Sequence, residues 1–199
     1  MPTTFQFEKE KLKPVVELFL RTGANFDDKF PQQFKRPMRL IMYENIPTVR
    51  MCDGFSWLDA LFTKEAINDF RKNWSHLKFH NLRDKILYVQ KWSLKLIQRD
   101  SSKHLCTYNN LSVIFCIEQF KPIVHEIPAQ RQVLAAVNMF DLERIRTMLE
   151  STRHGFLQSL IESKYEAIND FDDSLGLGSS EMPSMKSLMA KPEARTRSG

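Results

Sequence analysis

The segment that decides the predicted fold is Asn81–Arg99, with the sequence NLRDKILYVQKWSLKLIQR. Asn81 precedes Asp84 by three positions, a spacing typical of the capped start of a helix. Apolar side chains then recur at helical intervals and form two faces: Leu82, Ile86, Leu87, Val89, Leu94 and Ile97. The pattern predicts a helix from Asn81 to about Arg99, the longest in the chain.

The second half of the chain shows the same kind of pattern. Leu111–Phe120 follows an asparagine cap at position 109 or 110 and is apolar nearly all round, which predicts a central helix. Pro128 suits the first turn of a following helix, and Asp141 suits the cap of another. A last helix is expected from about Phe156 to Phe171.

The first half adds shorter segments. Glu8–Arg21 carries apolar residues at a helical period, and Gly23 suits its C-cap. Pro37–Pro47 is bounded by prolines and fits either a short helix or a strand, of which we favour the helix. Ser56 precedes Asp59 by three positions and is expected to open a helix that carries Trp57, Leu61, Phe70 and Trp74.

These periods together indicate an all-α fold, because no alternating apolar and polar run competes with them. We expect an irregular bundle of about seven to nine helices. Residues 1–171 form a single helical domain in this interpretation. From Asp172 the chain turns to Gly, Ser, Met and Pro without periodicity, which predicts a disordered tail over residues 172–199.

Composition excludes several classes of protein. Six glycines in 199 residues argue against a phosphate-binding loop, which needs closely approaching backbone. The three cysteines, Cys52, Cys106 and Cys116, form no C-x-x-C pair, so a disulfide scaffold or a thiolate zinc site is not expected. The longest apolar stretch, Leu111–Ile117, is too short to cross a bilayer. No charged-then-apolar leader opens the chain, so we expect an intracellular, soluble protein.

No group of residues predicts catalysis or metal binding. His76 and His80 have zinc-ligand spacing, but the sequence HLKFH lacks the glutamate of the metalloprotease motif and no third ligand is evident. No nucleophile elbow is present, and no motif lowers the pKa of a cysteine thiol. We therefore expect no enzyme activity, no cofactor and no metal.

The net charge of +5 is unevenly distributed. Residues 64–103 hold 10 basic and 4 acidic side chains (+6), whereas residues 104–175 hold 6 basic and 10 acidic ones (−4). The basic residues of the first block alternate with aromatic ones, as in segments that follow a phosphate backbone. Two interpretations stay open: the basic block docks against the acidic third of the same chain, or it faces nucleic acid.

One short motif resembles a known family. Ala60–Ile67 contains the string F-T-K-E-A and is similar to a helix of subunit 1 of the small-nuclear-RNA-activating protein complex (SNAPc). The preceding Asn25–Phe30, followed by Phe34-Lys35-Arg36, resembles the Phe-acidic-x-Phe pattern of that family. Further matching positions lie within residues 8–165: Trp74, Leu82-Arg83, Ile86-Leu87-Tyr88, the Asn110–Phe120 helix and the Phe140-Asp141 helix.

The resemblance implies a non-enzymatic scaffold subunit of a nuclear promoter-binding complex that supports transcription of small RNA genes. Its partners would be the Myb-repeat and zinc-containing subunits of that complex and the TATA-binding protein. Promoter DNA would be contacted mainly through these partners, and no membrane is involved. The aromatic residues implied as core or partner-binding are Phe26, Phe30, Phe62, Phe70 and Trp74. The residues implied to approach the DNA backbone are Lys72, Lys78, Arg83 and Lys91.

Two other functions remain as alternatives. The first is a generic helical adaptor or interaction module outside transcription, which the all-α pattern also allows. The second is a stand-alone protein that binds RNA or DNA through the basic block, with affinity that falls steeply as salt rises.

Overall fold

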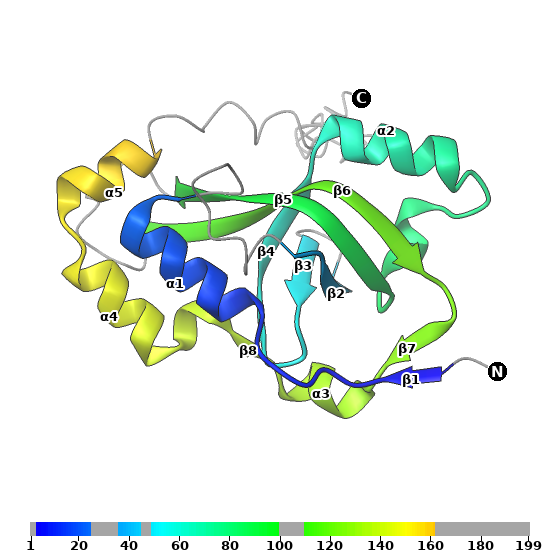
Figure 1. Cartoon of the computed structure of the whole chain (residues 1–199). Coiled ribbons are helices and arrows are strands. Elements are labelled where there is room, and N and C mark those ends of the chain that lie inside the picture. Colours follow the sequence, from blue (N-terminus) through cyan, green and yellow to red (C-terminus); the bar gives the residue numbers. More distant parts are fainter. Residues whose placement is uncertain (1–2, 25–35, 45–48, 100–109, 162–199) are drawn as a thin grey trace, which may run out of the picture.

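A computed structural model of the chain describes residues 3–24, 36–44, 49–99 and 110–161 (Figure 1). Its centre is a strongly curved sheet rather than a helical bundle. Five of the six strands of this sheet are β2 (Met38–Glu44), β3 (Val49–Cys52), β4 (Ser56–Phe62), β5 (Ile86–Gln98) and β6 (Leu111–Ile123). The expectation of an all-α fold is therefore wrong.

Strand pairing closes the sheet into a barrel. The strands neighbour one another in the order β3-β2-β5-β6-β4, and β3 also pairs with β4, so no edge is left among the five. All these pairs are antiparallel except β4 with β6, which is parallel. The helix α2 (Lys64–Asn73) connects β4 to β5 and the short η2 (Phe79–Leu82) precedes β5.

A β-bulge explains why the Asn81–Arg99 segment imitates a helix. Leu87 and Val89 face the barrel core, and the register with β6 then shifts between Val89 and Lys91 and again before Trp92. After the shift Trp92 begins a second alternating series, with Leu94 and Leu96 buried. Because the extra residue changes the phase of the alternation, the apolar positions are spaced by three as well as two, which resembles a helical period.

The Leu111–Phe120 segment was misassigned for a different reason. Strand β6 is buried on both faces along Leu111–Ile117. Phe115 and its alternate neighbours point into the main core, whereas Ile114 and Cys116 pack with Leu61 on the outside of the barrel. A strand covered on both faces has no polar alternation, so its sequence cannot be distinguished from a buried helix by periodicity.

Two further expected helices are wholly or partly strands. The Pro37–Pro47 segment forms β2 over its described part rather than the favoured helix. The segment that Ser56 opens is divided: it begins as β4, and its helix starts only after Thr63. The Thr63 Oγ1 accepts a hydrogen bond from the Ala66 backbone N–H at 3.2 Å, so Thr63 is the true N-cap.

The helices outside the barrel agree better with the sequence. Helix α1 (Leu12–Thr22) ends where expected, with Gly23 in the left-handed conformation at φ 68°. A Cβ at Gly23 would lie 2.9 Å from the Leu160 side chain, so glycine is required there for space as well as for conformation. The remaining helices are α3 (Gln130–Ala135), α4 (Glu143–Ser151) and α5 (His154–Ile161), with the short η4 (Met139–Asp141) before α4.

Three short strands complete the described elements. β1 (Thr3–Phe5) and β7 (Glu126–Pro128) pair in parallel as a separate two-stranded sheet. β8 (Val137–Asn138) adds to β4 in parallel. Pro128 thus ends a strand immediately before α3 rather than standing in the first turn of that helix.

Helices cover the barrel on two sides. In Figure 1, α1, α4 and α5 gather at the left and α2 lies at the upper right, with β5 and β6 running between them. On the α2 side Phe62 contacts Phe79 and Phe120 edge-to-face, with ring centroids 5.0 and 4.8 Å away. On the other side α1 buries Val16 and Phe19 completely. Both sides belong to the same core.

One buried carboxylate joins α1 to the barrel. Asp53 is fully buried in the turn between β3 and β4. Its Oδ2 accepts hydrogen bonds from the backbone N–H groups of Lys11 and Leu12 at 2.7 and 2.8 Å. Its Oδ1 accepts from the N–H groups of Phe55 and Ser56 at 3.1 and 2.9 Å. The four bonds satisfy donors at the start of the helix and in the turn at once.

The predicted tail over residues 172–199 and the predicted boundary at residue 171 lie outside the described residues. Phe26 and Phe30, implied as partner-binding, also lie outside them. Within the described part of the chain, every helix is too short or too polar to cross a membrane.

Candidate nucleic-acid interface

The outer face of β3 and β4 presents an arginine held between an aromatic ring and a carboxylate. The Arg50 guanidinium lies 4.4 Å from the centroid of the Trp57 ring. Its Nε lies 3.4 Å from Asp59 Oδ1. The side chains of Arg50 and Asp59 are 33% and 23% exposed, so the group is accessible from solvent.

Strand alternation places these three residues on one face. Val49, Met51, Leu58 and Ala60 point into the core, so the residues between them point outward. Arg50 lies directly opposite Asp59 across the antiparallel pair, and Trp57 lies diagonally from Arg50. A guanidinium fixed on an indole ring offers a flat surface for stacking and charged donors for a phosphate.

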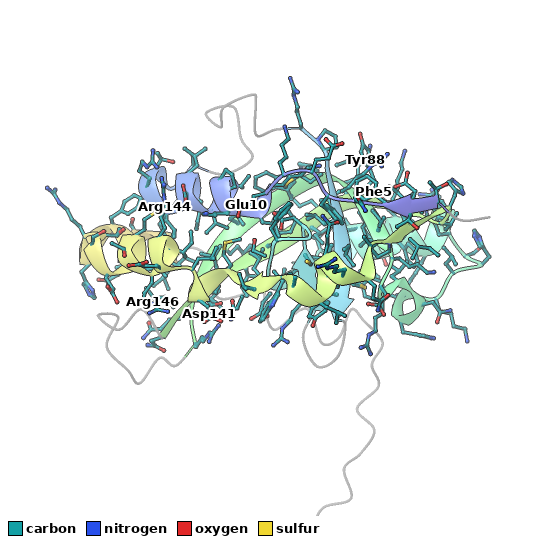
Figure 2. All side chains as sticks on the ribbon, turned by 90° about the horizontal axis from the view of Figure 1, so that it is seen from below. Phe5, Glu10, Tyr88, Asp141, Arg144 and Arg146 are labelled. Carbon is teal, nitrogen blue, oxygen red and sulfur yellow. The ribbon has the colours of Figure 1, made fainter. Side chains whose placement is uncertain are left out.

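A second basic and aromatic row crosses the outside of the barrel. Arg39 of β2 is in register with Tyr88 of β5, which is in register with Lys121 of β6. The Arg39 guanidinium binds both carboxylate oxygens of Glu126 at 3.0 and 3.2 Å, and it lies 4.8 Å from the Phe5 ring centroid. Figure 2 shows Tyr88 and Phe5 on the same part of the molecule.

The four basic residues implied to approach DNA are exposed but come from separate elements. Lys72 lies in α2, Lys78 and Arg83 flank η2, and Lys91 lies on β5. The Arg83 Nε lies 3.7 Å from Asp84. The Lys91 Nζ lies 2.9 Å from Glu118 of β6, and this hydrogen bond raises the pKa of Lys91. At Lys91, therefore, the basic block contacts the acidic third of the same chain.

The described aromatic residues implied as core or partner-binding contribute mainly to the core. Phe62 and Phe70 are 2% and 3% exposed, which places them inside the protein. Trp74 is half-buried at the C-terminal end of α2 and packs against the core. Of these three, only Trp74 offers part of its ring to a ligand.

Two cavities open beside the covering helices. One, of about 600 Å³, lies between α1, α4 and the start of α5 and is lined by Arg21, Arg144 and Arg153 over an apolar floor. Figure 2 shows Arg144 where α4 faces α1, and its Nε lies 2.9 Å from Glu17. The other, of about 390 Å³, lies between α2 and strands β5 and β6.

No metal site is found among the described residues, since no three His, Cys, Asp or Glu side chains gather there. His76 lies beside Trp74, with ring centroids 5.8 Å apart. Cys52 and Cys116 are buried, whereas Cys106 lies outside the described residues. Burial raises the pKa of Cys52 to about 11, so its thiol is neutral and unreactive near pH 7.

Sequence reasoning missed the Arg50–Trp57–Asp59 group. Ser56 was taken as a helix cap, and Ser56–Phe62 (SWLDALF) shows no regular alternation of apolar and polar residues that would have indicated a strand.

The strand order and the site define the class of protein. A closed five-stranded barrel with a helix between its third and fourth strands, and with a parallel pairing of its third and fifth strands, is an OB-fold. In OB-folds the second and third strands carry the face that binds oligonucleotides or oligosaccharides. Strands β3 and β4 hold these positions here, and they carry Arg50, Trp57 and Asp59.

The chain belongs to the family of the telomere-binding protein beta subunit (TEBP beta), whose model matches residues 22–163. It is 26% identical over 171 residues to the telomere-binding protein subunit beta of Stylonychia mytilus, covering 85% of this chain and 43% of that protein. It is 29% identical over 158 residues to the protein of the same name from Sterkiella nova, covering 79% and 40%. The chain thus spans less than half the length of these curated relatives.

A solved structure, described as the Est3 telomerase subunit in the yeast Hansenula polymorpha, matches 74% of this chain and 86% of that chain. Its TM-score is 0.46 and its identity is 10%, a likeness too distant to support an argument.

Family membership overturns the SNAPc assignment and everything it implied. Transcription of small RNA genes, the Myb-repeat and zinc-containing partners, the TATA-binding protein and promoter DNA are all withdrawn. The helical adaptor alternative is wrong as well, because the chain forms a barrel. The F-T-K-E-A string, Phe62–Ala66, begins at the last residue of β4, and only Lys64–Ala66 lie in helix α2. The expected nuclear location is compatible with a family of telomere-binding proteins.

Proposed function

We propose that this protein is a non-enzymatic subunit of a nuclear telomere-binding protein, and that it binds single-stranded DNA on the outer face of β3 and β4. The observation that carries the proposal is the partly exposed Arg50–Trp57–Asp59 group on the two strands that form the ligand face of an OB-fold. The family match over residues 22–163 supports telomeres as the source of the ligand.

The chemistry of the group fits a single strand better than a duplex. An unpaired base stacks on an aromatic ring whatever its identity, and such stacking is worth about 1–3 kcal/mol per base. The Arg50 guanidinium adds a phosphate donor beside the ring. Asp59 keeps Arg50 in place and partly offsets its charge, so the ring contributes more to affinity than the charge does.

The test is fluorescence anisotropy with a labelled single strand of mixed sequence, about 20 nucleotides long. Trp57→Leu is expected to weaken binding by roughly 5- to 100-fold, the equivalent of one lost stacking contact. Arg50→Gln is expected to weaken it less. Lys13→Gln on α1 removes one positive charge away from this face and serves as the matched control.

Equal affinities for Trp57→Leu, Lys13→Gln and the unaltered chain would contradict the proposed face. Binding of a blunt duplex as tightly as the single strand would contradict the proposed ligand. Melting temperatures of all variants separate a loss of binding from a loss of folding.

We infer that a companion subunit covers the exposed apolar residues along β7, α3 and β8. Ile127, Leu134 and Val137 are 44%, 74% and 45% exposed, although large apolar side chains favour burial. The curated relatives are named as subunits, which supports association with another chain.

The test is a pull-down from nuclear extract with two tagged proteins, the wild-type chain and the double variant Leu134→Asp, Val137→Asp. We expect the wild-type chain, but not the variant, to recover a telomeric single-strand-binding protein. Recovery of that protein with both, or with neither, would contradict the proposed docking surface.

A further inference from the structure

The cavity beside α2 is lined by both aromatic and polar side chains. Phe70 and Phe120 are stacked with ring centroids 5.6 Å apart and an interplanar angle of 19°, and they form its apolar floor. The half-buried Trp74 contributes the accessible part of its ring. The polar lining consists of one carboxylate, one ammonium group and three side-chain amides: Asp69, Lys121, Asn73, Gln90 and Gln119.

The bulge in β5 places Gln90 in this cavity. Val89 is paired with Phe120 and Lys91 with Gln119, so Gln90 is the additional residue on β5 without an opposite partner on β6. Bulges re-aim side chains in this way, and they are frequent beside functional sites. Gln90, the inserted residue that makes the apolar spacing of β5 resemble a helical period, therefore also lines the cavity.

The Gln90 amide has an unmet hydrogen-bonding requirement. Its Oε1 is buried and has no hydrogen-bond partner in the described part of the chain. An unpaired buried acceptor of this kind lowers the stability of the folded state by about 1–3 kcal/mol, so the unpaired oxygen calls for an explanation. A ligand that donates a hydrogen bond to this oxygen supplies one.

We propose that this cavity binds one unpaired nucleobase of the single strand, and that it prefers bases with an exocyclic amino group. The inference rests on the proposed function and deepens it. The amino group of adenine or cytosine donates to Gln90 Oε1 or to the Asp69 carboxylate, and glutamine amides pair well with adenine. Thymine presents carbonyl oxygens at the corresponding positions, which leaves these acceptors unpaired. Trp74 supplies the stacking surface.

The surroundings provide a route for the sugar–phosphate backbone. Lys121 lines the cavity and is in register with Tyr88, which is in register with Arg39. Because neighbouring strands are about 4.8 Å apart, these three residues extend from the cavity across two further strands of the barrel. The row alternates cations with an aromatic ring, as in proteins that follow a single strand.

The test measures the affinities of wild type and of Gln90→Leu for two single strands in anisotropy titrations. The strands are dA20, which contains only adenine, and dT20, which contains only thymine, each about 20 nucleotides long. Leucine is similar in size to glutamine and removes the unpaired amide, so folding should be preserved or improved. Gln90→Leu is expected to weaken dA20 binding at least fivefold and to leave dT20 binding unchanged. Gln130→Leu, an exposed change of the same type on α3, is the matched control and should alter neither affinity.

The outcomes separate this proposal from the proposed function. Unchanged dA20 and dT20 affinities in Gln90→Leu, with Trp57→Leu still weakening both, would overturn the cavity and leave the β3–β4 face intact. Equal weakening of both oligonucleotides by Gln90→Leu would also overturn it, because base selection would not reside there.

A second measurement decides the matter even if no oligonucleotide binds. Adenosine and thymidine monophosphates are titrated into isotope-labelled full chain while the side-chain NH₂ signals of Gln90 and the indole N–H of Trp74 are followed by NMR. Shifts with the adenine nucleotide but not with thymidine monophosphate would identify a free-nucleotide site of the same chemistry. Absence of shifts with both, together with no oligonucleotide binding, would overturn the proposal.

Discussion

The cavity beside α1 and the cavity beside α2 lie on different sides of the same barrel, and different kinds of polar group line them. The cavity between α1, α4 and α5 is lined by three guanidinium groups, Arg21, Arg144 and Arg153. The cavity between α2 and strands β5 and β6 is lined mainly by amides and aromatic rings. In both, the floor is formed by side chains of one shared core.

The difference separates affinity from selection. Guanidinium groups attract phosphates over a range of several ångströms and do not distinguish one base from another. Amides act only in direct contact and depend on the pattern of donors and acceptors they meet. If the chain binds a single strand as proposed, the groups suited to these two contributions lie beside different helices.

The largest effect on stability is expected when one buried ring of the shared core is truncated on either side of the barrel. Phe19→Ala in α1 and Phe70→Ala in α2 are each expected to lower the free energy of unfolding by about 3–5 kcal/mol, since both rings are buried. Denaturant unfolding followed by circular dichroism measures this loss. A cost below about 1 kcal/mol for either variant would show that its helix is not packed on the barrel.

Asp53→Ala tests how α1 is held on the barrel. The substitution leaves four backbone donors without their acceptor, so we expect a loss of about 2–4 kcal/mol in the free energy of unfolding. The control is Asp59→Ala, whose carboxylate is partly exposed and contacts Arg50. That change should cost less than about 1 kcal/mol. Similar losses for the two variants would contradict the structural role of Asp53.

The double variant Arg21→Gln, Arg153→Gln sharpens the contrast between the cavities. If these guanidinium groups neutralise phosphates, the slope of log K against log salt for a single strand should fall by roughly 1–1.5. The preference for dA20 over dT20 should not change, whereas Gln90→Leu should change the preference and not the slope. Anisotropy titrations at several salt concentrations measure both quantities. An unaltered slope would exclude the arginine cavity from DNA binding.

The smallest effect is expected at Lys91, close to the bulge that forms the amide cavity. Glu118 binds the Lys91 ammonium, so Lys91→Ala should cost no more than about 0.5 kcal/mol and barely affect DNA binding. The pKa of Lys91 is raised in the folded chain, so this contribution is present below the ordinary pKa of 10.5 and is lost as pH rises through the folded value. Unfolding titrations at pH 7 and above pH 11 check it. A larger loss of DNA affinity would show that Lys91 contacts phosphate.

The sequence allowed reliable prediction where a segment has one buried face and a clear end. Helix α1 was predicted with its glycine cap, and α4 was predicted from its apolar period. Residues Phe62 and Phe70 were also recognised as important, although their place is in the core. These segments share a property: their periodicity is set locally, by 3.6 residues per turn against one apolar surface.

Prediction failed where strand burial depended on distant segments. The bulge at Gln90 shifts the alternation of β5, and its presence is evident only from the register with β6. The Arg50–Trp57–Asp59 group was missed for a related reason. Those residues become one surface only when β3 and β4 pair, and nothing in their spacing along the chain brings them together.

The amino-acid sequence by itself determined the composition of the core, the helix that is capped at Gly23 and the uneven distribution of charge. The tertiary structure alone decided that the two longest apolar segments are strands, and that their pairing closes a barrel. The physical reason is that a helix satisfies its hydrogen bonds within itself, whereas a strand satisfies them with partners far along the chain. Local patterns therefore reveal the helices, and long-range pairing creates the outer face of β3 and β4 and the cavity beside α2.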